Sequence, residues 1–118
     1  MSYIDGFVIP VPAGNREAYL AMSKQMTATF KRLGATRVVE CWGSDVPDGK
    51  VTDYKMAVKA EDGENVVFSW IEWPDKAARD KGWESLMKDE RMKGPEDNPM
   101  AGARMIYGGY SVILDQSA

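Results

Sequence analysis

Histidine is absent from the 118 residues of this sequence, and cysteine occurs once, as Cys41. Without histidine the chain cannot form a histidine-assisted catalytic triad, a histidine-ligated haem site or the commonest zinc and non-haem iron sites. A single cysteine cannot form a disulfide within the chain, which is typical of proteins from a reducing cytoplasm. We therefore expect a cytoplasmic protein with no metal site and no cofactor.

Long apolar runs and a strong charge of one sign are also missing. No run approaches the roughly 20 apolar residues that a membrane helix needs, and the N-terminus resembles no export signal. The formal net charge is only −3, and a modest basic cluster is better explained as the solvent face and end of a helix than as a nucleic-acid interface. Its members are Lys24, Lys31, Arg32 and Arg37. We expect neither a membrane nor a nucleic acid as a partner.

The composition is otherwise that of an ordinary globular protein. Hydrophobic residues make up 44% of the chain and charged residues 28%, a balance that excludes intrinsic disorder. A chain of 118 residues suits one hydrophobic core and leaves no room for two. We therefore expect a single domain that spans residues 1–118.

Apolar patterning predicts four strands and two helices. The strand segments are rich in β-branched and aromatic residues, and the helical segments place apolar residues at three- and four-residue steps. The expected strands span residues 3–11, 36–43, 65–73 and 104–115, and the expected helices span residues 15–33 and 74–92. Residues 51–60 fit both an extended chain and a helical turn, so their conformation stays open. Gly94, Pro95 and Pro99 predict a loop of about ten residues.

The helices have recognisable ends and faces. Asn15 is a candidate N-cap of the first helix, and Gly34 occupies the position where a left-handed residue ends a helix. We expect Trp83, Leu86 and Met87 on the buried side of the second helix. The apolar stripe of the first helix consists of Tyr19, Met22, Met26, Phe30 and Leu33.

The order of these elements is that of the ferredoxin-like α+β fold, βαββαβ, with both helices on one face of a four-stranded antiparallel sheet. The strand at 65–73 is apolar on both faces, whereas a strand with one face in water would carry polar residues there. We therefore expect a second copy to cover the other face, so that a homodimer forms with its two sheets packed face to face. The two sets of apolar residues are Val66, Phe68 and Trp70 on one face and Val67, Ile71 and Trp73 on the other.

Four stretches carry a more specific pattern. They are Tyr3-Ile-Asp-Gly-Phe-Val-Ile-Pro-Val-Pro12, Val39-Glu-Cys41 with Asp45-Val-Pro-Asp-Gly-Lys50, Val66-Val-Phe-Ser-Trp-Ile71, and Arg104-Met-Ile-Tyr-Gly-Gly109. Together they span nearly the whole chain, and the last is the most specific. On these residues the sequence resembles the DUF1428 family of small bacterial proteins, within the dimeric α/β barrel superfamily.

The resemblance implies a ferredoxin-like dimer, and the family has no established activity. Relatives in the superfamily include cofactor-free oxygenases that act on electron-rich aromatic compounds, so the resemblance also implies an enzymatic hypothesis. The sequence departs from the family between residues 93 and 103. Where the family tends to have Pro-Phe-Asp-Gly-Lys-Arg, this chain has Pro99-Met-Ala-Gly-Ala-Arg104. If this loop is a lid, its chemistry here is more apolar and less charged.

Two acids within strands are the first candidates for chemistry. Asp5 and Glu40 lie among apolar residues, where an unpaired carboxylate costs free energy. Each could act as a base or a ligand-binding group, but pairing with a cation, such as Arg104 for Asp5, is the favoured explanation. If both lie on one face of the sheet, they could converge in the cavity between the two sheets. The sequence does not fix the register that decides this.

The start of the last strand supplies two further candidates. Arg104 could hold a carboxylate or phosphate and Tyr107 could supply a hydroxyl. Alternatively, Arg104 pairs with a strand acid, and the neighbouring glycines Gly108 and Gly109 make room at the dimer contact. Arg79 is expected to face solvent or to pair with an acid of its own helix, and Cys41 to be a small buried residue rather than a nucleophile. The complete candidate pocket is Asp5, Glu40, Trp42, Ser69, Arg104 and Tyr107.

Three kinds of function are compatible with these residues. The aromatic side chains, the two strand acids and Tyr107 fit a barrel that transforms a small hydrophobic or aromatic metabolite in a cavity between the sheets. The same residues fit a module that binds the metabolite without turnover. A structural homodimer whose cavity is filled by side chains is the alternative. We favour binding or transformation of a small molecule.

Overall fold

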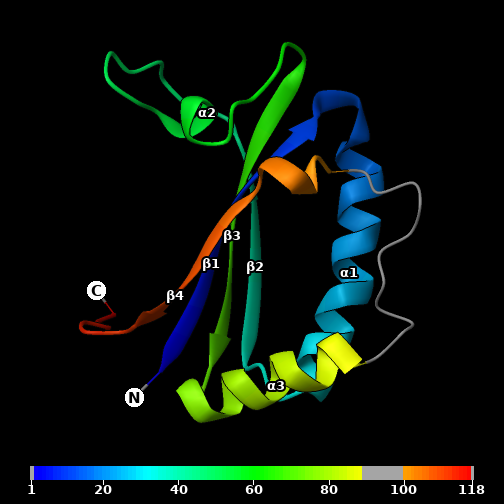
Figure 1. Cartoon of the computed structure of the whole chain (residues 1–118), viewed down its shortest axis with the longest axis vertical. Coiled ribbons are helices and arrows are strands. Elements are labelled where there is room, and N and C mark those ends of the chain that lie inside the picture. Colours follow the sequence, from blue (N-terminus) through cyan, green and yellow to red (C-terminus); the bar gives the residue numbers. More distant parts are fainter. Residues whose placement is uncertain (1, 89–99, 118) are drawn as a thin grey trace.

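The computed structural model describes residues 2–88 and 100–117. All four described strands form one antiparallel sheet in the order β2-β3-β1-β4, and helices α1 and α3 lie on one side of it (Figure 1). This arrangement confirms the ferredoxin-like α+β fold. The strands are β1 (Tyr3–Pro12), β2 (Arg37–Trp42), β3 (Glu64–Trp73) and β4 (Ile106–Ser111); the helices are α1 (Arg16–Arg32), α2 (Tyr54–Ala57) and α3 (Lys76–Lys88), with short 3-10 turns η1 (Ala13–Asn15) and η3 (Gly102–Arg104).

The first three strands lie within two residues of their predicted bounds, whereas the prediction for the last strand was too long. Arg104 belongs to the turn η3, and β4 begins at Ile106 and ends at Ser111. Ser111 pairs with Tyr3, the first residue of β1. Among the described residues, one further backbone hydrogen bond follows, from Val112 N–H to the carbonyl oxygen of Ser2 at 3.2 Å, and β4 thus ends where its partner β1 begins.

Helix α1 packs its predicted apolar stripe against the sheet. Tyr19 and Phe30 are buried, and the other members of the stripe are partly buried. Gly34 has a φ of +112°, as expected for a residue that ends a helix. Asn15 stands at the N-cap, but its side chain makes no capping hydrogen bond. This part of the prediction was wrong because the turn η1 leads directly into the helix.

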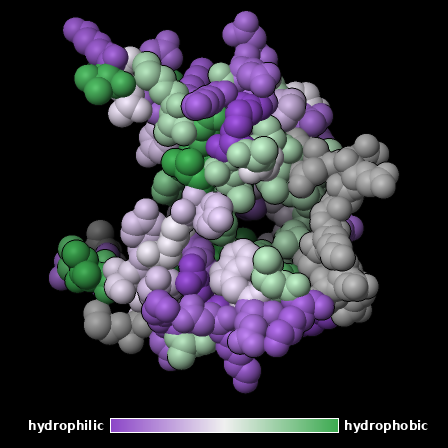
Figure 2. All heavy atoms as spheres, viewed as in Figure 1, coloured by the Kyte–Doolittle hydropathy of each residue, from purple (hydrophilic) through white to green (hydrophobic). Residues whose placement is uncertain are grey.

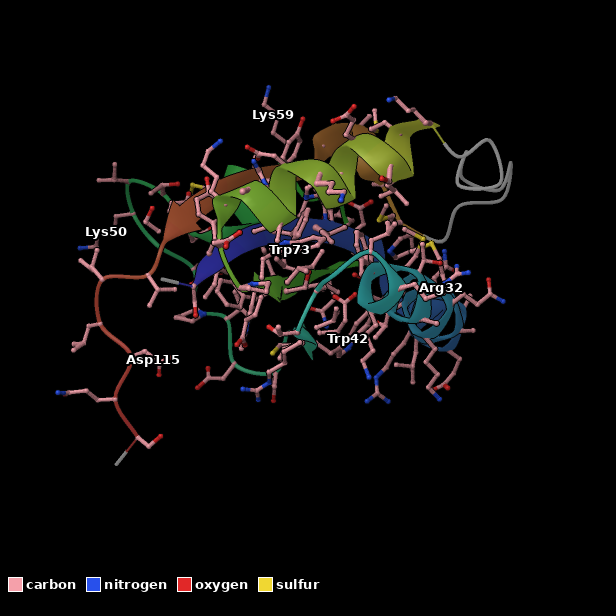
Figure 3. The ribbon with its side chains drawn as sticks, turned by 90° about the horizontal axis from the view of Figure 1, so that it is seen from below. Arg32, Trp42, Lys50, Lys59, Trp73 and Asp115 are labelled. Atoms are coloured by element: carbon pink, nitrogen blue, oxygen red, sulfur yellow. The ribbon has the colours of Figure 1, made fainter. Side chains whose placement is uncertain are left out.

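Helix α3 contacts the sheet through a narrower face than predicted. Leu86 is buried and Trp83 packs against the same core, but the expected burial of Met87 was wrong, because 81% of that residue is exposed. Gly82 is also buried, and its missing side chain allows the helix to approach Trp73. Figure 3 shows Trp73 between α3 and the strands. The predicted continuation of this helix to residue 92 and the glycine and prolines at 94, 95 and 99 that mark the predicted loop lie outside the described residues.

The ambiguous segment at 51–60 contains the short helix α2. The Asp53 carboxylate accepts hydrogen bonds from the backbone N–H groups of Met56 at 2.7 Å and Gly49 at 2.9 Å, and these bonds lower the pKa of Asp53. After α2, Val58 is buried with 1% exposure. The segment therefore covers one end of the sheet on the side opposite α1 and α3 (Figure 1).

The pairing register divides the strand residues into two sets. Phe7 pairs with Ser69 and Asp5 pairs with Ile71, so these odd-numbered residues share the side that faces α1 and α3, here called the helix face. The even-numbered residues of β1, β3 and β4, such as Phe68, point to the other side, here called the open face. Within the described residues, no helix is long and apolar enough to cross a bilayer.

We expect Gly82→Ala to destabilise the protein, although alanine favours helices. A Cβ at this position would lie 2.7 Å from the Trp73 ring and 3.2 Å from the carbonyl oxygen of Leu33. Overpacking of this kind costs about 1–3 kcal/mol of unfolding free energy, which urea denaturation would measure. Gly14→Ala is the control, because a Cβ there meets nothing within 4 Å. Equal stability of the two variants would contradict the packing described here.

Candidate functional site

The helix face contains a cavity between α1 and the sheet. Its volume is about 160 Å³, and in Figure 2 the molecule is hollowed between the strands and α1. Most of the wall is apolar, and methionine contributes four of the side chains. The lining residues are Phe7, Ile9, Tyr19, Met22, Ser23, Met26, Thr27, Phe30, Val38, Glu40, Ser69, Ile71, Trp83, Met100 and Met105.

One side of this cavity is polar. Glu40 lies on the edge strand β2 and reaches toward α1, where Tyr19 donates a hydrogen bond to its Oε1 at 2.9 Å and Ser23 donates one to its Oε2 at 2.8 Å. Tyr19 and Ser23 are both 5% exposed, whereas Glu40 is exposed. The carboxylate therefore stands at the mouth of the cavity, with two buried hydroxyl groups directed at it.

The Tyr19 hydroxyl is held protonated in this arrangement. Burial of Tyr19, followed by the negative charge and hydrogen bond of Glu40, raises the pKa of the phenol well above its ordinary value. Tyr19 consequently acts as a hydrogen-bond donor to Glu40 at all physiological pH values and is not a candidate general base.

Ser69 places a second polar group next to Glu40. The two residues are paired across β2 and β3, and Ser69 is 5% exposed and lines the cavity. A ligand in the cavity would therefore meet one carboxylate and one serine hydroxyl at the same end of an apolar chamber.

The Asp5 carboxylate forms a separate, fully occupied cluster on the helix face. It is 3% exposed and accepts hydrogen bonds from Trp73 Nε1 at 3.0 Å and Trp83 Nε1 at 2.7 Å. Arg79 adds two more donors, Nε at 3.0 Å and Nη2 at 2.8 Å. The side chains link β1, β3 and α3 around one buried charge, which is the structural role that was favoured for Asp5.

Arg79 is the partner that the sequence interpretation missed. It was expected to face solvent or to pair with an acid of its own helix, and it does contact Asp80, but its principal partner is Asp5. The hydrogen bonds that Arg79 donates to Asp5 raise the pKa of the guanidinium, and its Cζ lies 5.3 Å from the centroid of the Tyr3 ring. Gly109 makes this contact possible, because a Cβ there would lie 2.9 Å from Arg79 Nη2. That glycine makes room within the protomer, on the helix face.

Arg104 pairs with a strand acid, but with a different one. Its two terminal nitrogens each lie 2.7 Å from the carboxylate of Glu64, and Nη1 also donates to the carbonyl oxygen of Lys59 at 2.8 Å. The predicted pairing with Asp5 was therefore wrong. Arg104 lies in η3, and the hydrogen bonds lower the pKa of Glu64.

The six predicted pocket residues do not form one site. Asp5 and Glu40 both lie on the helix face, so the register places them together on one side but away from the face that a second sheet would cover. Glu40 and Ser69 line the cavity. Trp42 packs at the end of β2 against the core around Ile9. Tyr107 is 73% exposed, and its ring stacks on Phe7 with 6.4 Å between centroids.

Cys41 and two residues of α1 have surroundings that the sequence interpretation did not predict. Cys41 is exposed rather than buried, because it lies on the edge strand and points away from α1. Tyr19 and Ser23 had not been assigned to the site, although their spacing of four residues on the buried stripe places them on one helix face. In the described part of the chain, no group of three or more His, Cys, Asp or Glu residues could hold a metal ion.

We expect Asp5→Asn to be severely destabilising. The substitution leaves a partly buried guanidinium without its charge partner and directs amide N–H groups toward two indole N–H donors, and breaking such a pair costs about 3–5 kcal/mol of unfolding free energy. Asp80→Asn is the control, because Asp80 contacts the same Arg79 from a side chain that is 48% exposed, and we expect it to lose less than about 1 kcal/mol. Similar losses in both variants, measured by urea denaturation, would argue against a special role for Asp5.

Comparison with known proteins gives consistent relatives. The family described as "Protein of unknown function (DUF1428)" matches residues 2–102. Proteins named "Uncharacterized protein YbaA" from Escherichia coli K12 and Shigella flexneri are each 56% identical over 117 residues, which is 98% of this chain and 100% of theirs. A crystal structure of a provisionally named antibiotic biosynthesis monooxygenase from Bacillus cereus has a TM-score of 0.55 and 14% identity, covering 99% of this chain and 98% of that one.

The structural neighbour and the sequence relatives show different things about this chain. The Bacillus cereus structure shares the fold, and at this identity it supports nothing further about activity. The family match covers most of the sequence, and the YbaA proteins extend the likeness to nearly its full length. The chain therefore belongs to the DUF1428 family.

Proposed function

We propose that the chain acts as one domain that binds a small, mainly apolar molecule in the cavity between α1 and the sheet. The observation that carries this proposal is the contrast within the cavity: an apolar wall rich in methionine, with Glu40 and Ser69 at one end. Binding sites for small molecules typically combine apolar walls with a few placed polar groups, and methionine adapts its shape to different ligands.

The size of the cavity restricts the ligand. An apolar cavity of about 150 Å³ accommodates a benzene-sized molecule, and the volume here is about 160 Å³. We therefore propose a compact ligand, with one ring or a short branched chain. The site lies within one protomer, between helix and sheet, and replaces the cavity between two sheets as the candidate location.

We further propose that the open face of the sheet forms a homodimer interface. Several large apolar side chains are exposed there, including Phe68 at 45% and Tyr110 at 65%. They border a groove of about 780 Å³, and none of the described residues that line it is charged. An uncharged apolar groove can meet an identical copy of itself without repulsion, which suits a two-fold dimer.

The surroundings of the open face favour a second copy as its occupant. The segment that contains α2 and the segment that follows β4 both lie on this side of the sheet (Figure 1), and the latter exposes Ile113 at 92% and Leu114 at 73%. Figure 3 shows Asp115 in this segment extending away from the strands. Apolar side chains this exposed gain burial when they contact a partner.

The binding proposal predicts that filling the cavity abolishes binding. Val38→Phe adds a ring on the helix face of β2, which takes up the volume in which the ligand would bury its own apolar surface. We therefore expect the affinity for benzyl alcohol, measured by ¹H–¹⁵N NMR titration, to fall at least about tenfold. Val39→Phe makes the same change on the opposite face of the same strand and is expected to retain binding. Unchanged affinity in a folded Val38→Phe variant would refute the location of the site.

The dimer proposal predicts that one charge on the open face produces monomers. Phe68→Asp places a carboxylate at the centre of the proposed interface, and burying an unpaired charge there is prohibitive. Leu20→Asp is the control, because Leu20 is 42% exposed, similar to Phe68, and lies on α1. We expect sedimentation equilibrium to show a dimer for the unmodified protein and the control, and a monomer for Phe68→Asp. A monomeric unmodified protein would contradict the proposal.

A further inference from the structure

The sheet contains four acidic residues within its described strands, and three of them have an arginine partner. Asp5 pairs with Arg79 at 2.8 Å, and Glu64 pairs with Arg104 at 2.7 Å. Glu72 lies 3.7 Å from Arg37. An acid in a strand thus normally receives a cation from elsewhere in this fold.

Glu40 is the exception. Among the described residues, no lysine or arginine forms an ion pair with it, and its two oxygens accept hydrogen bonds from Tyr19 and Ser23 instead. Hydroxyl donors orient the carboxylate but leave its negative charge uncompensated. Each carboxylate oxygen can also accept a further hydrogen bond. The group is therefore fixed in position while retaining the capacity to bind a cation.

The position of Glu40 directs this capacity toward the cavity. Its carboxylate lies at the polar end of an apolar chamber, next to Ser69, whose side chain lines the same cavity. An ammonium group has three N–H donors, which match the remaining acceptors of the carboxylate and the serine oxygen. A neutral apolar ligand would leave these acceptors unused, and an anion would be repelled by Glu40.

We propose that the ligand is a small amine, with an ammonium group held by Glu40 and Ser69 and a compact apolar body in the methionine-rich part of the cavity. This inference rests on the proposed function, because it identifies the chemical class of the ligand at the same site. In this arrangement the ligand supplies Glu40 with a positive charge, as arginine does for the other three acids in the strands.

Three single-ring probes of similar size test the charge preference. Benzylammonium, benzyl alcohol and benzoate differ in charge at pH 7 and can be titrated into the ¹⁵N-labelled protein. We expect benzylammonium to bind about fivefold to tenfold more tightly than benzyl alcohol, as for a partly exposed charge-assisted hydrogen bond, and benzoate to bind most weakly. The preference for benzylammonium should fall as sodium chloride is raised to about 0.5 M, because salt screens the ion pair.

Matched variants assign the preference to Glu40. Glu40→Gln keeps the side-chain size and removes the charge, so the two affinities should become nearly equal. Glu72→Gln makes the same substitution on the open face of the sheet and should leave the preference intact. The salt titration uses the unmodified protein, so it tests the inference independently of how Glu40→Gln folds.

The outcomes separate the two levels of the proposal. If benzyl alcohol binds the cavity as tightly as benzylammonium, or if the preference persists in Glu40→Gln, the amine inference is overturned while ligand binding stands. If no probe shows saturable binding at residues that line the cavity, the proposed function itself is overturned.

Discussion

A buried charge organises one side of this fold. The Asp5 carboxylate, 3% exposed in the central strand β1, could not remain there without donors, and it obtains them from Trp73, Trp83 and Arg79. Two of these residues belong to α3, so satisfying one carboxylate fixes the position and rotation of a helix. Trp83 also lines the cavity. The cluster around Asp5 therefore sets one wall of the proposed binding site without touching a ligand.

Asp5 and Glu40 show how similar sequence contexts lead to different chemistry. Both are acids in apolar strands, and both lie on the helix face. Asp5 is in a central strand, where its full complement of donors leaves it no capacity for other partners. Glu40 is in an edge strand, where solvent reaches the carboxylate and where, among the described residues, its side-chain hydrogen bonds come from hydroxyl groups. The edge position is what allows Glu40 to keep its charge available.

The fold could be predicted from the sequence because alternation and helical periodicity are local properties. The two faces of β3 and the apolar stripe of α1 follow directly from them. The partners of Asp5 and Arg104 could not be predicted, since they depend on which segments lie side by side in space. Arg104 lies 40 residues from Glu64, and Arg79 lies 74 residues from Asp5. The exposure of Met87 was missed for a related reason: the rotation of α3 is set by Asp5 and Gly82.

The two proposed surfaces use alternate residues of the same strands, which places a strict demand on register. Ser69 contributes to the cavity, while its neighbours Phe68 and Trp70 contribute to the open face. A shift of one residue between β1 and β3 would exchange the two sets and bury the wrong side chains. Ten consecutive residue pairs hold this register, and the hydrogen bond from Trp73 Nε1 to the Asp5 carboxylate joins the two strands through side chains as well. A shifted register would separate Asp5 from Trp73. By opposing that shift, the hydrogen bond between them also keeps the apolar residues of β3 on the open face.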